Sequence, residues 1–328
     1  MPKEKTNLKE VLAAINKKHG AGTAIAGDDE VTAVEWSSSN CFSLDRIMGK
    51  GIPMGRVIDV YGSQSSGKST LAMYLVAQVQ KAGGTAAWID AEFSFTSEYA
   101  DKIGVDSKKL IYSQPKNGEE ALDVVVQLVD SGDVDIIVID STAALVPQKE
   151  LDGDITDSNV ALQARLLSKG LRMITGACAK SKTVIIFISQ LRDKIGAMAF
   201  GPTTDSTGGK ALKFYSSIRL EVKKIKSLKV GDEVVGNRLS IAATKNKVAT
   251  PFRVAEIDLY FAKGIDTLGD IMDLAAEKGI ITKSGANYFF GDLKLGFGRD
   301  AAKEFLDKDP KTFKLIKDAL SAEGKIKK

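Results

Sequence analysis

Short, continuously apolar stretches alternate with longer stretches of helical periodicity from residue 57 onward. The short stretches predict strands buried on both faces, and the longer ones predict amphipathic helices. The predicted strands are Val57–Tyr61, Ala86–Asp90, Ile136–Asp140, Val184–Ser189, Ile218–Val222, Leu239–Thr244 and Ala255–Leu259, and the main helices are Ser69–Lys81, Gly118–Ser131 and Asn159–Ala179. This order predicts an α/β fold with a mostly parallel twisted sheet flanked by helices. Because no long helix separates the last three strands, we expect an antiparallel extension of the sheet.

Smaller elements flank this core at both ends. Residues 7–18 predict an amphipathic helix that either packs on its own domain or docks on another subunit. Past Gly264 the pattern predicts two strands and three helices: Thr267–Lys278, Ile280–Thr282, Tyr288–Phe290, Asp300–Leu306 and Pro310–Leu320. We therefore expect an N-terminal helix and linker (1–32), a core (33–265) and a small C-terminal α/β domain (266–328).

The composition limits the classes of function. A 44% hydrophobic and 27% charged chain without a membrane-length apolar stretch predicts a soluble, cytoplasmic protein with no membrane partner. Two widely spaced cysteines and the single His19 argue against a disulfide framework, a zinc site or histidine-based catalysis. Because the net charge is only +4, any nucleic-acid site must be a local patch.

A phosphate-binding motif follows the first strand of the core. The pattern G-x-x-x-x-G-K-S/T is matched in full, and a predicted helix follows it. Backbone N–H groups of such a loop wrap phosphates, its lysine reaches the β- and γ-phosphates, and its last hydroxyl can bind Mg²⁺. The residues that we expect to bind nucleotide here are Gly62, Ser63, Gln64, Ser65, Ser66, Gly67, Lys68, Ser69 and Thr70.

Two acidic residues are expected at the same edge of the sheet. Asp140 ends an apolar strand, where with Ser69 it can hold Mg²⁺. Glu92 follows another strand, where it is either a base that activates the attacking water or a solvated carboxylate. Together with the phosphate loop, these residues predict an ATP hydrolase that uses ATP and Mg²⁺.

Five segments carry a resemblance to a known family. In chain order they are Ile89-Asp90-Ala91-Glu92, Asp140-Ser141-Thr142-Ala143-Ala144-Leu145-Val146-Pro147, Leu162-Gln163-Ala164-Arg165, Gly208-Gly209-Lys210-Ala211-Leu212-Lys213-Phe214-Tyr215 and Lys245-Asn246-Lys247. Together they resemble the bacterial-type RecA recombinases over roughly residues 7 to 320. The resemblance implies a helical filament of this chain on single-stranded DNA that pairs with homologous double-stranded DNA and exchanges strands in recombination and repair.

The resemblance also implies roles for individual residues. The N-terminal helix becomes an arm that docks on the next subunit, Glu92 becomes the catalytic carboxylate, and Tyr99 lies against the adenine. Gln190 senses the γ-phosphate. Lys245 and Lys247 reach the ATP of the adjoining subunit, where they stabilise charge on the transferred phosphoryl group.

Two segments, Glu150–Ser158 and Leu191–Gly209, predict neither helix nor strand and are candidate DNA-binding loops. Because the second begins directly after Gln190, bound ATP could order it. Charge, glycine content and the resemblance together give this set of expected DNA contacts: Val160, Arg165, Ser168, Arg172, Arg192, Lys194, Ile195, Gly208, Gly209 and Lys210.

The chain departs from the family pattern at Asp193, Ala199, Lys210 and the Phe93-Ser94-Phe95 run, which suits a phage-encoded or divergent member. Alternative functions for the same motifs are a hexameric helicase, a small-molecule kinase with a phosphate loop, or a filament-forming scaffold without turnover. Closed rings would distinguish the helicase, and activity without DNA would distinguish the kinase.

Overall fold

The structure is a computed structural model that describes residues 7–20, 22–24, 33–154, 162–193 and 204–326. Contacts within the chain divide it into two compact units, Met1–Glu35 and Trp36–Lys328. The first unit contains α1 (Leu8–His19), whose N-cap Asn7 accepts a hydrogen bond from the N–H of Lys9. This confirms the helix predicted over residues 7–18. No residue of α1 is buried.

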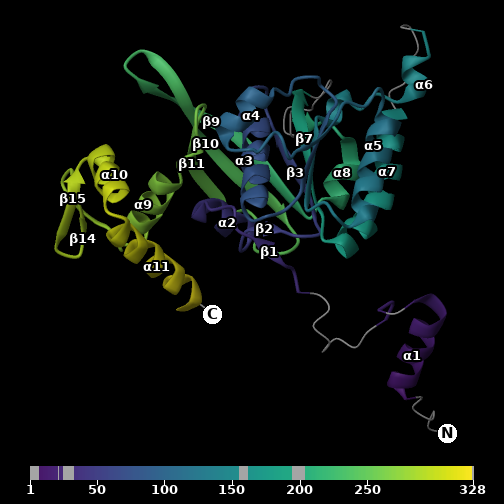
Figure 1. Ribbon diagram of the computed structural model, residues 1–328, viewed down its shortest axis with the longest axis horizontal. Helices are drawn as coiled ribbons and strands as arrows, with labels where there is room; N and C mark the ends of the chain where they lie inside the picture. Colours follow the sequence, from purple (N-terminus) through teal and green to yellow (C-terminus); the bar gives the residue numbers. More distant parts are fainter. Residues whose placement is uncertain (1–6, 21, 25–32, 155–161, 194–203, 327–328) are drawn as a thin grey trace. The chain divides into compact units, whose positions relative to one another are not determined.

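A ten-stranded sheet forms the centre of the second unit (Figure 1). Its strands are β3 (Val57–Gly62), β4 (Ala86–Asp90), β5 (Ile111–Ser113), β6 (Ile136–Asp140), β7 (Val184–Asp193), β8 (Thr204–Ser206), β9 (Ile218–Val230), β10 (Glu233–Asn246), β11 (Val254–Tyr260) and β12 (Gly264–Ile265). The main path is β12-β11-β10-β9-β3-β7-β6-β4-β5, and β8 pairs with β7. Pairing is parallel from β9 to β5 and antiparallel from β9 to β12. The predicted parallel sheet with an antiparallel extension is thus confirmed.

Helices cover both faces of this sheet because its central strands are apolar on both sides. One face packs against α2 (Phe42–Met48), α3 (Lys68–Lys81) and α4 (Ser97–Ile103), and the other against α5 (Gly118–Ser131), α7 (Leu162–Ser181) and α8 (Gly209–Tyr215). The shorter elements are β1 (Trp36–Ser37), β2 (Ile52–Pro53), η1 (Thr142–Ala144) and α6 (Gln148–Leu151). In the described ranges, no helix is both long and apolar enough to cross a membrane.

β9 and β10 extend well beyond the strands predicted from the sequence. Residues 218–222 of β9 alternate between buried and half-buried, and from Lys223 most of the strand is exposed and rich in lysine. The apolar pattern therefore ends at residue 222, although the ladder with β10 continues to the Val230–Glu233 pair. The predicted bounds Ile218–Val222 and Leu239–Thr244 were too short because lysines, glycines and acidic residues interrupt the apolar run in this hairpin.

The C-terminal part of the second unit has its own hydrophobic cluster. It contains α9 (Thr267–Glu277), β13 (Thr282–Ser284), β14 (Asn287–Phe290), β15 (Leu293–Phe297), α10 (Arg299–Lys308) and α11 (Pro310–Ile326). The predicted helices are confirmed, but the predicted hairpin is a three-stranded sheet that begins at Thr282 rather than Ile280. The third strand was missed because only Leu295 is buried in it. We call residues 266–326 the C-terminal module.

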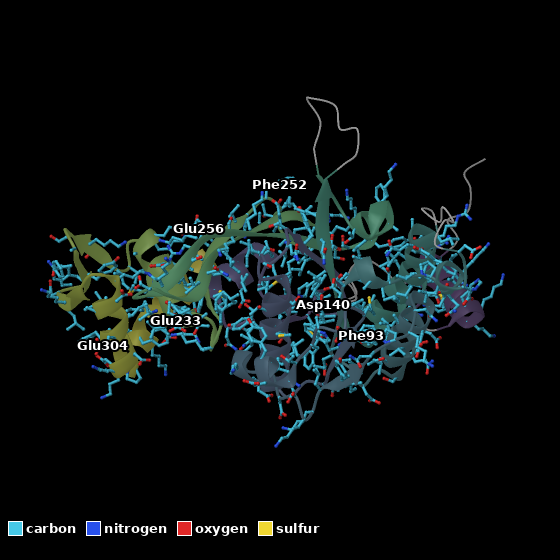
Figure 2. The ribbon with its side chains drawn as sticks, turned by 90° about the horizontal axis from the view of Figure 1, so that it is seen from above. Phe93, Asp140, Glu233, Phe252, Glu256 and Glu304 are labelled. Carbon is cyan, nitrogen blue, oxygen red and sulfur yellow. The ribbon has the colours of Figure 1, made fainter. Side chains whose placement is uncertain are left out.

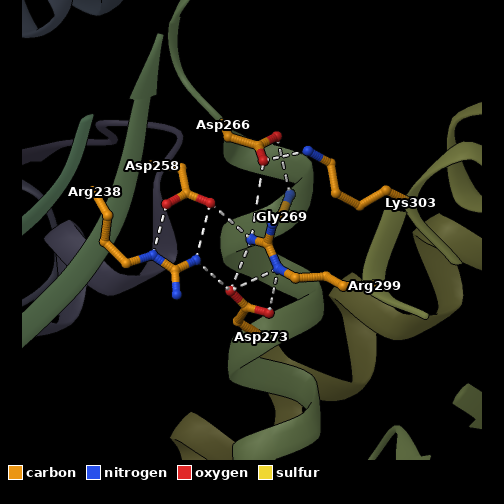
Figure 3. Close-up of polar contacts among 7 residues, drawn as sticks. All are labelled: Arg238, Asp258, Asp266, Gly269, Asp273, Arg299 and Lys303. Carbon is orange, nitrogen blue, oxygen red and sulfur yellow. Dashed lines mark hydrogen bonds and ion pairs between the residues drawn. The ribbon is translucent and has the colours of Figure 1, made fainter. Parts of the chain in front are cut away.

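An ion-pair cluster joins the edge of the main sheet to the C-terminal module (Figure 3). Both oxygens of Asp258 on β11 accept hydrogen bonds from Arg238 on β10, at 2.7 and 2.9 Å. Arg299, the first residue of α10, lies 3.2 Å from Asp258 and donates to Asp273 on α9 at 2.8 and 2.9 Å. The cluster of Arg238, Asp258, Asp273 and Arg299 therefore connects the two parts through a carboxylate that is only 4% exposed.

Replacing Asp258 by asparagine is expected to lower the free energy of unfolding by about 2 kcal/mol, since two arginines lose a charged partner. Burial raises the pKa of Asp258, but hydrogen bonding to Arg238 and nearby positive charge outweigh burial and hold this pKa below its usual value. The stabilisation from this shift is present above the unfolded-state pKa and is lost as pH falls through the folded-state pKa. Urea unfolding at neutral and acidic pH measures both effects, and the difference from wild type should shrink in acid.

Glu277→Gln is the matched control. It breaks the ion pair between Arg46 and Glu277, whose side chains are 37% and 59% exposed, respectively. Its effect should stay within about 0.5 kcal/mol. Equal effects of the two variants at neutral pH would contradict a structural role for the ion-pair cluster.

Candidate active site

The phosphate loop lies between the end of β3 and the start of α3, as its motif predicts. Gly67 adopts the left-handed conformation at φ +94° and is the N-cap of α3. Gly62 has no room for a side chain, because a Cβ there would overlap the carbonyl oxygen of Val222 on β9. The glycines of the motif are therefore required by backbone conformation and by close approach of neighbouring strands.

Lys68 lies over this loop. Its ammonium group donates to the carbonyl oxygen of Ser63 at 2.7 Å, and the residue is only 7% exposed. Burial lowers the pKa of Lys68, while the charges of Asp140 and Glu92 oppose that change. A lysine that lies among backbone groups of the loop is positioned to bind phosphate oxygens.

Asp140 ends β6 next to Asp90 at the end of β4. Burial, with only 3% of the residue exposed, raises the pKa of Asp140 to about 6. A hydrogen bond from Ser69 opposes the increase, and the charges of Glu92 and Asp90 add to it. The predicted pair of Ser69 and Asp140 thus lies together beside Lys68.

This pair fits a magnesium ion that is shared with phosphates. Mg²⁺ is commonly held in nucleotide sites by one or two protein oxygens, with phosphate and water completing its six ligands. Ser69 and Asp140 supply such oxygens. Across the described ranges, no group of three or more His, Cys, Asp or Glu side chains could hold a metal ion without other ligands.

Glu92 lies in the turn after β4. Figure 2 labels Phe93, the residue that follows it, and Asp140. Its backbone N–H donates to the carbonyl oxygen of Asp140 at 3.2 Å. Its Oε1 accepts hydrogen bonds from the hydroxyl of Ser141 and, at 3.0 Å, from Nε2 of Gln190 on β7. The structure therefore brings the predicted Glu92 and Gln190 together and adds Ser141. Ser141 was not singled out, although it immediately follows Asp140 in the sequence.

A cavity of about 210 Å³ opens beside the phosphate loop. Besides residues 65–70, it is lined by Asn237 on β10 and by Leu259 and Phe261 from β11 and the turn after it. Within the described chain, the buried polar atoms that lack a hydrogen-bond partner include Ser66 Oγ and Asn237 Oδ1. Two unpaired polar atoms in one cavity fit a polar ligand. Asn237 and Leu259 were missed because they lie on strands, whose sequence pattern indicates burial but not a ligand, and Phe261 lies in the turn that follows β11.

Tyr99, the predicted adenine neighbour, lies on α4. Its hydroxyl is 3.0 Å from Oγ1 of Thr70 in the first turn of α3. This contact brings Tyr99 beside the phosphate loop.

Lys245 and Lys247, at the end of β10 and just after it, lie at the C-terminal end of α8. The ammonium groups of both donate to the carbonyl oxygen of Phe214, at 3.1 and 2.8 Å, and Lys245 also donates to that of Lys213. Burial, followed by the positive charge of Lys247, lowers the pKa of Lys245 to about 8. Cations at this position stabilise the carbonyl end of a helix.

The two candidate DNA segments contain more regular structure than predicted. Residues 148–151 form α6, which overlaps the first segment. In the second, β7 continues to Asp193 and pairs with β8, and α8 begins at Gly209. Treating residues 191–209 as wholly irregular was therefore wrong at both ends, since backbone pairing continues where apolar alternation stops. Residues 155–161 and 194–203 lie outside the described chain.

The described DNA candidates lie on α7 and at the start of α8. Arg165 and Arg172 are exposed on α7 and Ser168 is half-buried between them, a spacing that follows one helical face. The remaining described candidates are Gly208 and Gly209, both with positive φ, and the exposed Lys210. Val160, Lys194 and Ile195 fall outside the described residues, as does the side chain of Arg192.

Comparisons with known proteins cover nearly the whole chain. Residues 6–266 match the RecA N-terminal domain, and residues 269–324 match the RecA C-terminal domain. Protein RecA of Chloroherpeton thalassium is 49% identical over 311 residues, which cover 94% of this chain and 87% of that protein. Protein RecA of Chlorobium limicola is 50% identical over 318 residues (96% and 91% of the two chains), and that of Lactobacillus johnsonii 47% over 317 residues (96% and 88%).

Proposed function

This chain belongs to the RecA family of DNA-dependent ATPases and recombinases, and from that membership we propose how its own residues share the work. The observation that carries the proposal is the contact of Glu92 with Gln190 and Ser141, beside a phosphate loop that contains Lys68. Because both domains of the family match, a hexameric helicase or a small-molecule kinase is no longer needed to explain the motifs.

ATP is bound by the loop of residues 62–70. The backbone N–H groups and Lys68 meet its phosphates, and Tyr99 lies on the side of its base. Asn237 Oδ1 requires a donor, and in ATP only the adenine amino group and the ribose hydroxyls donate. We therefore assign Asn237 to the nucleoside rather than to the phosphates.

Glu92 orients the attacking water and accepts its proton. The hydrogen bond from Gln190 couples the Glu92 carboxylate to β7. The first residues of β7 lie in the core, and its last residues belong to the second candidate DNA segment. Ser69 and Asp140 would hold Mg²⁺, which supplies charge stabilisation at the β- and γ-phosphates when bound.

Lys245 and Lys247 act on the ATP of the adjoining subunit in a filament of this chain. In the single subunit they hold the last carbonyl groups of α8, whose first residues Gly209 and Lys210 are candidate DNA contacts. α8 thus has the cations of the ATP reaction at one end and DNA candidates at the other. This arrangement supports coupling between DNA binding and hydrolysis.

Single-stranded DNA is bound along α7 and the start of α8, and a homologous duplex then pairs with it. Arg165, Arg172 and Lys210 are exposed cations suited to phosphates, and Gly208 and Gly209 let backbone groups approach closely. Contacts of this kind bind DNA with little dependence on its sequence, as a recombinase requires.

The two cysteines, Cys41 and Cys178, are buried and unpaired, which fits a reducing cytoplasm.

ATP hydrolysis should be strongly stimulated by single-stranded DNA, because DNA candidates and ATP residues share β7 and α8. The measurement is phosphate release with and without DNA across a salt series. With about four phosphate contacts per subunit, the logarithm of the DNA affinity should fall with the logarithm of salt concentration at a slope of about −3. If the protein binds DNA but its rate of ATP hydrolysis does not change when DNA is added, the proposed coupling is contradicted. Only the assignment of the nucleotide site would then remain.

A further inference from the structure

The turn that carries Glu92 is built around a buried carboxylate. Asp90, the last residue of β4, has no exposed surface. Its two oxygens accept the backbone N–H groups of Ser94 and Phe95, both at 3.1 Å, and the hydroxyl of Tyr112 on β5 at 2.8 Å. Two of these bonds close the chain back over residues 91–93, so the carboxylate fixes the path of the turn.

An aromatic stack holds the far end of the same turn. The ring of Phe95 lies between those of Trp88 and Tyr112, with centroids 5.5 and 5.2 Å away. Phe93 takes φ +55° and leaves 65% of its surface exposed, so the turn does not bury the side chain that follows Glu92. A left-handed residue of this size keeps its conformation only where its neighbours determine it.

The near end of the turn is held by β6. The N–H groups of Ala91 and Glu92 both donate to the carbonyl oxygen of Asp140, at 2.8 and 3.2 Å. The backbone on either side of the Glu92 side chain is thus fixed, by Asp140 before it and by Asp90 after it. Tyr112 is the one side-chain donor that Asp90 receives from outside the turn among the described hydrogen bonds.

We propose that Tyr112 and Asp90 are positioning residues for ATP hydrolysis, which hold the turn so that the Glu92 carboxylate meets the attacking water. The inference rests on the proposed role of Glu92. Neither residue touches the phosphate loop in the described contacts. Tyr112 therefore acts through Asp90 and the turn, whereas Asp90 also lies beside Asp140, whose pKa its charge raises.

The state of the phenol supports this role. Partial burial and the hydrogen bond to Asp90 raise the pKa of Tyr112 to about 12. The hydroxyl therefore remains a donor over the whole range of pH in which an ATPase is assayed. A misplacement of about 1 Å in a catalytic group can cost up to a hundredfold in rate, so one bond in the support of Glu92 is enough to matter.

Tyr112→Phe tests the proposal because it removes only the hydroxyl and keeps the ring of the stack. The DNA-stimulated kcat should fall roughly three- to tenfold, while the KM for ATP and the affinity for a nonhydrolysable ATP analogue stay unchanged. Asp90→Asn, which places an amide donor among backbone donors, should lower kcat further. Tyr288→Phe in the C-terminal module is the matched control and should leave kcat as in wild type.

A double-mutant cycle separates positioning from general loosening of the fold. In a Glu92→Gln background, Tyr112→Phe should lower the residual rate no further, because the group it positions is gone. Wild-type kcat in both Tyr112→Phe and Asp90→Asn would overturn the proposal, as would an equal loss of analogue binding. A wild-type protein without DNA-stimulated turnover would instead overturn the proposed function, so the two failures can be told apart.

Discussion

Replacing Lys68 by alanine is expected to lower ATP turnover at least about a hundredfold, with or without DNA. The ammonium group of Lys68 lies over the phosphate loop, 2.7 Å from the carbonyl oxygen of Ser63 and near Asp140 and Glu92. Without it, the negative charge that develops on the transferred phosphoryl group loses its closest cation from the same subunit. Phosphate release by the purified variant measures the effect.

The fold should survive this substitution. Burial lowers the pKa of Lys68, which means that folding disfavours its charged form and that its removal relieves a cost. Lys81→Ala, at the exposed last residue of the same helix, is the matched control and should keep wild-type turnover. Wild-type rates for Lys68→Ala would show that the loop of residues 62–70 is not the site of hydrolysis.

Lys245→Ala is expected to remove DNA-stimulated turnover, by about a thousandfold, while single subunits still bind ATP. A cation that a neighbouring subunit supplies to a transferred phosphoryl group contributes roughly a thousandfold to kcat. Within one subunit the ammonium group of Lys245 binds the carbonyl oxygens of Lys213 and Phe214. The variant should therefore retain the affinity of isolated subunits for an ATP analogue.

Mixing two inactive variants tests whether Lys245 acts across the interface. Glu92→Gln subunits keep Lys245, and Lys245→Ala subunits keep Glu92. Where a Glu92→Gln subunit supplies its Lys245 to the ATP site of a Lys245→Ala subunit, that interface has both Glu92 and Lys245. Activity should therefore return in proportion to the fraction of interfaces between unlike variants. If mixtures stay as inactive as either variant alone while filaments still form, Lys245 serves its own subunit. Lys317→Ala mixed with wild type controls for dilution, since Lys317 is exposed on α11.

Local signals in the sequence were sufficient to predict the parallel sheet and the strand, loop and helix of the phosphate-binding motif. Ile136–Asp140 is continuously apolar until its final aspartate, and the strand has those bounds in the structure. The motif of residues 62–69 specifies a strand, a loop and a helix, and each is present. Such features depend on residues that are close in the chain, so pattern and spacing are enough to predict them.

Features that depend on distant residues could not be predicted in this way. The ion-pair cluster joins Arg238, Asp258 and Arg299, and the sequence around each of these residues does not indicate which residue it pairs with. The same holds for Tyr112 and Asp90, which are 22 residues apart and meet only because β5 pairs with β4. The contact of Lys245 with α8 also spans 32 residues and depends on how β10 ends. Topology, rather than composition, creates these contacts.

The position of Lys245 and Lys247 has a consequence for assemblies of different length. A head-to-tail filament has two unlike ends, and at one of them the last nucleotide has no following subunit to supply lysines. Within the described contacts, the lysines of the subunit at the opposite end have only their own α8 to bind. If Lys245 and Lys247 act across the interface as proposed, an assembly of n subunits contains n − 1 complete reaction centres. Specific activity should then rise with length, and short oligomers should hydrolyse ATP most slowly. Turnover per subunit would thus be a measure of polymer length. After subunits are lost from one end, the shortened assembly would again have one complete reaction centre fewer than it has subunits.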